Sequence, residues 1–366
     1  MQKLKDIINF LETVAPLNLQ EGYDNSGLLY GNPEQSIEKT IVSLDLTDAV
    51  LDEAISLNAQ LIIVHHPPVF KPIKRLSYTD PVSQMLIKAI RADIAVYAIH
   101  TNLDNVLWGV NGEIAARLDL HDLEVLSPLH HSHQKLITYV PKSHTAAVRD
   151  AIFRAGGGSI GHYSECSFTT EGIGTFKADI GAKPWIGHVG ERHTETEEKL
   201  EILFPMHLKG KVIEALRSFH PYETVAFDVL ALENSFKEIG AGAIGKLTNP
   251  MPGKIFLEKV RSIFGSTVIR HNSIEKKEIS KVALCGGAGK SLINNALGKN
   301  ADAYLTADLS YHDFFVPGHQ MLLADFGHYE SEQYTSDLII RLVTEKFPNF
   351  AVLKTAIKTN PVHYLL

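Results

Sequence analysis

Residues 61–68 read Leu-Ile-Ile-Val-His-His-Pro-Pro, a short apolar run that stops abruptly at polar residues. This pattern is the main basis for the fold that we predict. Two further runs behave in the same way: residues 94–99 stop at His100, and residues 321–324 stop at Asp325. Apolar runs of this length are typical of strands buried on both faces, and the helical spacing after them is typical of strand–loop–helix units. We therefore predict an α/β core of two lobes with mostly parallel or mixed sheets covered by helices.

The middle of the chain has a different pattern, an internal repeat. Residues 136–141 read Leu-Ile-Thr-Tyr-Val-Pro, and residues 200–205 read Leu-Glu-Ile-Leu-Phe-Pro. Each copy is followed by an amphipathic helical pattern and a second strand-like run, and a duplicated βαβ unit is the ferredoxin-like layout. Because polar, turn-rich segments flank the repeat, we expect a core formed by residues 1–130 and 235–366, with an inserted ferredoxin-like α+β domain at residues 131–234.

Composition narrows the class of protein. The chain has 366 residues, 45% hydrophobic and 21% charged, which is typical of a globular protein. A net charge of -7 without a Lys/Arg-rich run disfavours a nucleic-acid or anionic-membrane partner. We expect a cytoplasmic protein with no membrane partner, because no apolar run approaches about 20 residues and the N-terminus lacks a secretory-signal layout. With 18 His and only 2 Cys, any bound metal must rely on imidazole and carboxylate ligands.

Histidines and carboxylates follow three of the expected strands. His65 and His66 follow the first run, Asp104 lies just after the second, and His328 and Glu332 after the third are spaced to share one helix face. Each element alone also fits an ordinary role: histidines in a Pro-rich turn, an Asp capping a helix that begins near residue 105, or a solvated His–Glu pair. Together they predict a metal site, because the strand ends of an α/β sheet gather at one edge.

Three imidazoles and two carboxylates are more ligands than a catalytic zinc with three protein ligands requires. They suit two divalent ions about 3.5 to 4 Å apart, bridged by a carboxylate and by water. We expect Zn²⁺, with Mn²⁺ or Fe²⁺ as alternatives, because His/carboxylate sites accept several metals. Such a pair of ions acidifies water, so the sequence predicts metal-assisted hydrolysis.

Other residues are weaker candidates for the same pocket. Asp308 and His312 are four residues apart, and we predict that they orient a ligand or move a proton, with a helix-start pair as the alternative. The glycine-rich stretch 286–291 is not a phosphate-binding loop, because Leu284 stands where that motif needs glycine. It predicts instead tight packing between a strand and the following helix, with a turn that lets the backbone approach a ligand or the metal centre as the alternative.

Five motifs together resemble the GTP cyclohydrolase I type 2 family, also called the Nif-three-like family, nearly from end to end. The motifs are Tyr23-Asp24-Asn25-Ser26-Gly27-Leu28, His65-His66-Pro67, His100-Thr101-Asn102-Leu103-Asp104, Thr306-Ala307-Asp308-Leu309-Ser310-Tyr311-His312 and Gly327-His328-Tyr329-Glu330-Ser331-Glu332. The middle segment resembles the PII-like or CutA-like domain that is inserted in the longer bacterial members.

The resemblance implies a dinuclear site and a ring-shaped homohexamer whose metal sites face an internal cavity. Its implied metal ligands are the five residues reached above, namely His65, His66, Asp104, His328 and Glu332. It also makes Asp24 and Asn25 candidate pocket residues. The implied activity is metal-activated hydrolysis of a purine nucleotide or a related substrate, with His312 or Asp308 moving protons. The alternative function is a non-catalytic, metal-binding regulatory or scaffold ring whose inserted domain senses a small molecule or a partner.

Overall fold

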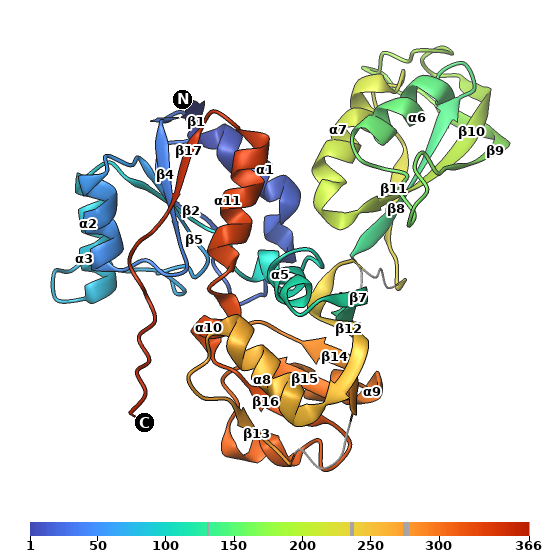
Figure 1. Cartoon of the computed structure of the whole chain (residues 1–366). Helices are drawn as coiled ribbons and strands as arrows, with labels where there is room; N and C mark the ends of the chain where they lie inside the picture. The colour runs from blue at the N-terminus through green and yellow to red at the C-terminus, as the bar shows by residue number, and fades with distance from the viewer. Residues whose placement is uncertain (130–131, 235–237, 274–277, 366) are drawn as a thin grey trace. The chain divides into compact units, whose positions relative to one another are not determined.

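The computed structural model describes residues 1–129, 132–234, 238–273 and 278–365 (Figure 1). The chain divides into two units: unit 1 is Met1–Pro128 with Lys237–Leu366, and unit 2 is Leu129–Phe236. Residues 130, 131 and 235, where domain boundaries are expected from the sequence, lie outside the described ranges.

A five-stranded mixed sheet forms the first half of unit 1. Its strand order is β17 (Ala351–Lys354), β4 (Lys39–Ser43), β5 (Leu61–Val64), β6 (Ala95–Ala98) and β2 (Gly27–Tyr30). The strands from β17 to β6 are parallel, and β2 is antiparallel to β6. All four residues of β5 are buried because helices cover both faces of the sheet.

The alternation of side chains along β5 shows which helices cover each face. Ile62 and Val64 belong to the core cluster of α2 (Asp48–Ser56) and α3 (Pro81–Arg91). Leu61 and Ile63 belong to the cluster that includes α1 (Leu4–Val14) and α11 (Thr335–Lys346), which lie on the opposite side of the sheet in Figure 1.

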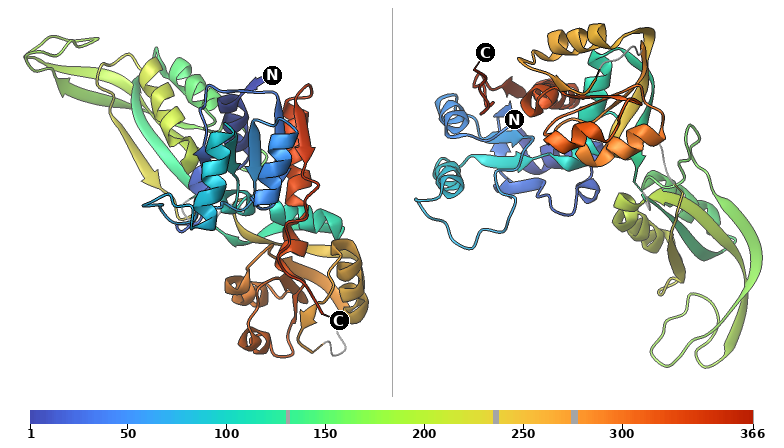
Figure 2. Two further views of the ribbon diagram at one scale, coloured as in Figure 1. Left: turned by 90° about the vertical axis from the view of Figure 1, so that its left-hand side faces the viewer. Right: turned by 90° about the horizontal axis from the view of Figure 1, so that it is seen from below.

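A six-stranded mixed sheet forms the second half of unit 1. Its order is β13 (Arg270–His271), β16 (Leu322–Asp325), β15 (Ala303–Thr306), β14 (Glu278–Leu284), β12 (Gly240–Pro252) and β7 (Leu120–Pro128). Strands β14, β15 and β16 are parallel and the other pairs are antiparallel. Helices α8 (Gly253–Phe264) and α9 (Ile293–Gly298) cover opposite faces, as the right-hand view of Figure 2 shows. Both sheets contribute to one core cluster, so the expected mixed α/β core is confirmed.

Short helical elements connect the strands of unit 1. They include α4 (Thr101–Asp104), α5 (Val110–Arg117), α10 (His328–Glu332), η1 (Leu17–Leu19), η3 (Lys290–Leu292) and η4 (Tyr311–Phe315), beside a small pair of strands, β1 (Gln2–Lys3) and β3 (Ser36–Ile37). The alternative that Asp104 caps a helix beginning near residue 105 is wrong, because Asp104 ends α4 and the next helix starts at Val110. None of the helices in the described ranges is both long and apolar enough to cross a membrane.

Unit 2 contains a four-stranded antiparallel sheet with two helices. The sheet order is β11 (Phe227–Ala231), β8 (His133–Pro141), β10 (Arg192–Pro205) and β9 (Phe168–Lys177), and the helices are α6 (Thr145–Arg154), α7 (Lys209–Phe219) and the short η2 (Met206–Leu208). Leu200, Ile202 and Phe204 of β10 are buried in a core with α6 and α7, whereas Glu197 and Lys199 alternate with them on the other face. Both helices therefore cover the same face of this sheet.

Candidate metal centre

The carboxyl ends of the parallel strands in the first sheet of unit 1 bring several polar side chains to one edge. Asp45 follows β4, His65 and His66 follow β5, and His100 follows β6. Because neighbouring parallel strands end at the same edge, these residues lie close together, with the rings of His65, His66 and His100 between 4.9 and 5.3 Å apart. Glu332 reaches the same edge from α10, which follows β16 of the second sheet.

His65 is completely buried and points one nitrogen at the cluster. Its Nδ1 donates to the backbone carbonyl of Ile99 at 2.8 Å, so Nε2 carries the free lone pair. This Nε2 lies 3.7 Å from Asp104 Oδ1 and 3.9 Å from Glu332 Oε1. Both His65 Nε2 and Asp104 Oδ1 are buried without a hydrogen-bond partner. Two unsatisfied buried atoms that face each other are costly unless something binds between them.

His66 is held in the same manner by a carboxylate. Its Nδ1 lies 2.7 Å from Asp45 Oδ1, and Asp45 also accepts a hydrogen bond of 2.6 Å from the Thr359 hydroxyl. The other ring nitrogen lies 2.9 Å from Glu332 Oε2. Asp45 thus fixes which nitrogen of His66 faces the cluster.

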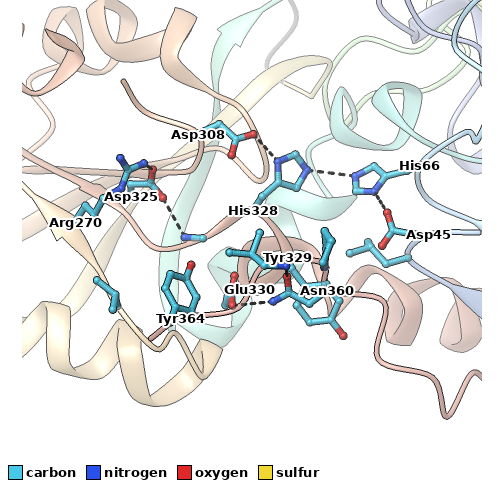
Figure 3. A pocket seen from close by; sticks show the side chains of 15 residues that line it. Asp45, His66, Arg270, Asp308, Asp325, His328, Tyr329, Glu330, Asn360 and Tyr364 are labelled. Carbon is cyan, nitrogen blue, oxygen red and sulfur yellow. Dashed lines mark hydrogen bonds and ion pairs between the residues drawn. The ribbon is translucent and has the colours of Figure 1, made fainter. Parts of the chain in front are cut away.

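His328 completes the pattern from the second sheet. Its Nδ1 lies 2.7 Å from Asp308 Oδ2, and its Nε2 lies 3.0 Å from Glu332 Oε2, one helical turn away. Figure 3 shows the His328 ring between Asp308 and His66, whose Nε2 atom is 3.4 Å from that of His328. Glu330 points elsewhere and accepts from Asn360, because residue i+2 of a helix does not share the face of residues i and i+4.

The glycine-rich turn after β14 lies directly against Glu332. Gly287 has a φ of +59°, and a Cβ atom there would lie 2.3 Å from Glu332 Oε1. The Gly287 amide donates to the Ser331 hydroxyl at 2.9 Å. The close approach that the sequence left as an alternative is therefore what the structure contains: glycine is needed so that the turn can pass the buried carboxylate.

His100 also lies in the cluster, although it is not among the five metal ligands expected from the sequence. Its Nδ1 lies 2.8 Å from Asp24 Oδ1, and Asp24 also accepts from the Thr101 amide at 3.0 Å. Asp24 therefore lies behind His100 and positions its ring. Asn25 donates to the backbone carbonyl of Val69 at 2.7 Å and so anchors the Pro-rich loop after His66.

The pKa values of the side chains in the cluster are shifted in opposite directions. Burial lowers the pKa of His65 to about 4. Burial opposes protonation of His66 and His328 too, but the neighbouring carboxylates outweigh it and raise their pKa values to about 9 and about 11. Burial raises the pKa of Asp104 well above its usual range. Burial also acts to raise the pKa of Glu332, but the positive charge of His328 and the hydrogen bonds from the surrounding imidazoles together outweigh it and hold this pKa well below its usual range. A cation beside Asp104 would favour its ionised form.

The donor set fits metal ions. Two groups of ligand atoms lie within 4.8 Å of one another: His65 with His66 and His100, and His66 with His328 and Glu332. These are nitrogen and carboxylate oxygen donors, the ligands that Zn²⁺ and similar ions accept. The Cys285 thiol lines a cavity beside the cluster. Burial raises the pKa of this thiol above its usual range, which disfavours the thiolate.

A cavity of about 710 Å³ opens onto the cluster. Its lining includes His66, His100, Asp104, His328 and Glu332. A second cavity, of about 490 Å³, reaches His66, Asp308 and His328 from the side of the C-terminal segment (Figure 3). His312 lies on the exposed η4 beside Tyr311 and is not among the lining residues of either cavity.

The fold and the cluster together define a two-sheet α/β protein with a His/carboxylate site at its strand ends. The sequence profile of the family Duf34/NIF3 (NGG1p interacting factor 3) matches residues 2–361, so the chain belongs to this family.

Curated relatives match over nearly the whole chain. A Bacillus subtilis protein named GTP cyclohydrolase 1 type 2 homolog is 39% identical, covering 99% of this chain and 98% of its own length. A protein of the same name from Halalkalibacterium halodurans is 36% identical, with 98% of each chain covered. Among solved structures, a Bacillus cereus protein related to NIF3 has a TM-score of 0.85 and 34% identity, covering 100% of this chain and 99% of its own.

Proposed function

We propose that unit 1 binds two divalent metal ions, most simply Zn²⁺, and that it is a metal-dependent hydrolase acting on a purine nucleotide or a related substrate. The observation that carries the metal proposal is the pair of unsatisfied buried atoms, His65 Nε2 and Asp104 Oδ1, at 3.7 Å. The name GTP cyclohydrolase 1 type 2 homolog, which the curated relatives share, supports the choice of substrate.

Glu332 suggests how the ligands divide between the two ions. Its Oε2 lies near His66 and His328, at 2.9 and 3.0 Å, whereas Oε1 lies on the side of His65 at 3.9 Å. We assign His66, His328 and Glu332 to one ion. His65, Asp104 and the same Glu332 would hold the other ion.

Bound divalent ions would supply Lewis acidity and would lower the pKa of coordinated water toward neutrality. The chain itself positions the ligands: Asp45, Asp308 and the Ile99 carbonyl each hold the Nδ1 of one imidazole, so that every Nε2 faces the cluster. Between Asp308 and His312, we retain Asp308 as a positioning residue, because it contacts His328.

Proton transfer is better placed on His100 than on His312. The His100 ring lines the larger cavity and is oriented by Asp24 through Nδ1, so Nε2 is left to accept or donate a proton at the cavity wall. This arrangement of a base with a carboxylate that orients it is what general acid–base catalysis requires.

Unit 2 we propose to be an inserted ferredoxin-like domain of residues 131–234. In chain order its elements are β8, α6, β9, β10, α7 and β11, and the spatial order of the strands is β11-β8-β10-β9. This is a split βαβ arrangement with both helices on one face. The homohexamer stays a prediction from the family resemblance, and the cytoplasmic location stays a prediction from the sequence pattern.

Metal content tests the ligand assignment. In a variant with His65→Ala and Glu332→Ala, we expect both ions to be lost, because each ion would lose at least one of its proposed ligands. His319→Ala, at an exposed histidine in the same unit, is the matched control and should keep both ions. Unchanged occupancy of both ions in the double variant would refute the assignment.

Turnover tests the hydrolase proposal separately. Protein of measured metal content is assayed against GTP and other phosphorylated or cyclic substrates, and we expect metal-dependent release of product that His100→Gln reduces by about 10² or more. Absence of turnover with every substrate, despite two bound ions, would instead favour the non-catalytic regulatory or scaffold role.

A further inference from the structure

Unit 2 contains a cavity of about 900 Å³ that has no part in the metal chemistry. It lies on the face of the sheet opposite α6 and α7, where β9 and β10 continue past the end of β8 at Pro141. The segment between β9 and β10, residues 178–191, turns back over this face and contributes Ala182, Pro184 and Trp185 to the lining.

Two glycines of β9 leave the floor of the cavity open. Gly172 and Gly174 alternate with Ile173, so both lie on the cavity face. A Cβ atom at Gly174 would lie 2.1 Å from Glu197 Oε2, so the Glu197 carboxylate occupies the space that a side chain at position 174 would need. Any larger residue at position 174 would displace Glu197 from the floor.

Aromatic rings form the walls. The Tyr222 ring lies 6.1 Å from that of Trp185 and 5.9 Å from that of Phe176. Trp185 also contacts the His144 ring at 5.1 Å, and the Lys183 amide donates to Glu223 at 2.9 Å, so the returning segment is attached at Lys183 and at Trp185. The walls are therefore ordered surfaces on which a hydrocarbon chain or a cation can pack.

The charges of the lining favour a cation. It includes four carboxylates and two ammonium groups, namely Glu171, Asp179, Glu197, Glu223, Lys177 and Lys199. Glu171 is neutralised by Lys142 at 2.6 Å, and Lys199 is held by Glu201 at 2.5 Å. The balance that is left is three carboxylates against one ammonium group, which would repel a phosphate.

Glu197 is the carboxylate best placed to receive a ligand. The Tyr222 hydroxyl donates to its Oε1 at 2.8 Å, and among the residues that the structure describes Glu197 has no ion-pair partner. Glu197 can accept further hydrogen bonds, since a carboxylate offers about four acceptor positions. The metal-capable groups of the described residues are in unit 1, so an inorganic ion is not the expected occupant.

We propose that the cavity of unit 2 binds an organic polyamine, with one ammonium group on Glu197 and the carbon chain against Trp185 and Tyr222. A cation with several ammonium groups on a carbon chain matches both the excess of carboxylates and the aromatic walls. This site is independent of the proposed hydrolase function, because all the residues that form it belong to unit 2.

Tryptophan fluorescence of the full-length protein can test the proposal. The chain has two tryptophans, Trp108 and Trp185, so in a Trp108→Phe background the emission reports on the cavity alone. We expect spermidine to give a saturable change that about 0.5 M NaCl weakens, since salt screens the ion pair. The neutral chain 1,4-butanediol should give none. No saturable change with spermidine, or equal binding of the diol, would overturn the proposal.

Variants locate the site. Glu197→Gln removes the charge and should weaken spermidine binding about tenfold or more, whereas Glu214→Gln, at an exposed position of α7, should leave it unchanged. By calorimetry, Trp185→Ala should weaken binding about threefold to thirtyfold. Equal affinities of the two glutamine variants would refute the assignment. Metal content should be the same in both, which separates this result from the test of the metal centre.

Discussion

The candidate metal centre of unit 1 and the aromatic cavity of unit 2 are assembled from the chain in opposite ways. His66 and Glu332, 2.9 Å apart, are separated by 266 positions in the sequence. In unit 2, Gly174 and Glu197 belong to one hairpin, and the segment that closes the cavity joins its two strands. The cluster therefore depends on the packing of two sheets, whereas the cavity depends mainly on local pairing.

A repeated tripeptide shows the consequence. Gly161-His162-Tyr163 and Gly327-His328-Tyr329 have the same residues. His162 is exposed in a loop of unit 2, whereas His328 contacts Asp308 and Glu332 and lies beside His66. The same side chain becomes a candidate ligand only where the fold places carboxylates next to it.

The largest effect that we expect is a loss of stability in unit 2 that leaves the metal content of unit 1 unchanged. Phe204 is fully buried in the core of unit 2, so Phe204→Ala should lower the free energy of unfolding by about 3 to 5 kcal/mol. Chemical denaturation followed by Trp185 emission measures this change. The metal content should stay the same under conditions in which the variant is folded, because no proposed ligand belongs to unit 2.

Phe168→Ala is the matched control for this prediction. Phe168 lies in the same sheet but is 66% exposed, so its truncation should change stability by no more than about 0.5 kcal/mol. Loss of metal from a folded Phe204→Ala protein would show that the two regions are coupled.

Metal removal should have the next largest effect, and it should act on unit 1. At a free Zn²⁺ concentration of about 100 times the dissociation constant, binding adds about 2.7 kcal/mol to the unfolding free energy. Single-tryptophan variants distinguish the units, since Trp108 lies in unit 1 and Trp185 in unit 2. A chelator should shift the transition seen by Trp108 and leave that seen by Trp185 in place. An equal shift of both transitions would contradict the separation.

Asp45 and Asp308 test whether carboxylates position the proposed metal ligands of unit 1. Each carboxylate holds the Nδ1 of one proposed ligand, so Asp45→Asn and Asp308→Asn should each weaken metal binding about 10- to 100-fold. Competition with a chelating dye measures the affinity. Asp6→Asn, at an exposed position of α1, should bind metal as the parent does. If both site variants matched this control, the carboxylates would not position the imidazoles.

Thr359 should give the smallest effect. Its hydroxyl donates to Asp45 at 2.6 Å, so Thr359→Ala removes one hydrogen bond to Asp45. Asp45 itself contacts the proposed ligand His66 and is not a proposed ligand. We expect metal affinity to fall by less than about tenfold, in line with about 1 kcal/mol for one hydrogen bond. Thr359→Ser keeps the hydroxyl and should restore the parent affinity. A failure of serine to do so would assign the effect to packing.

Much of the core architecture could be predicted from short apolar runs. The runs that stop at His65, His100 and Asp325 are the strands β5, β6 and β16, because a strand buried on both faces has a continuous apolar sequence. The alternative of a helix capped by Asp104 does not anticipate α4, because a four-residue helix is too short to produce a periodic pattern.

The sequence could have indicated two residues that were left out of the predicted site. Asp45 directly follows the run at residues 40–44, and His100 follows the run at residues 94–99, so the rule that selected His65 applies to both. His312 was selected by its spacing from Asp308, and spacing does not reveal that it lies on an exposed turn outside the lining of both cavities.

The strands, the internal repeat and the supply of imidazole and carboxylate groups follow from the amino-acid sequence alone, because periodicity and composition are properties of the chain. Which nitrogen of each histidine faces the cluster depends on the folded molecule, since Asp45, Asp308 and the Ile99 carbonyl become neighbours of the imidazoles when the sheets pack. It also decided that Gly287 lies against Glu332 and that Gly174 leaves room for Glu197. Contacts between residues far apart in the chain have no periodic signal, so they appear only in the folded molecule.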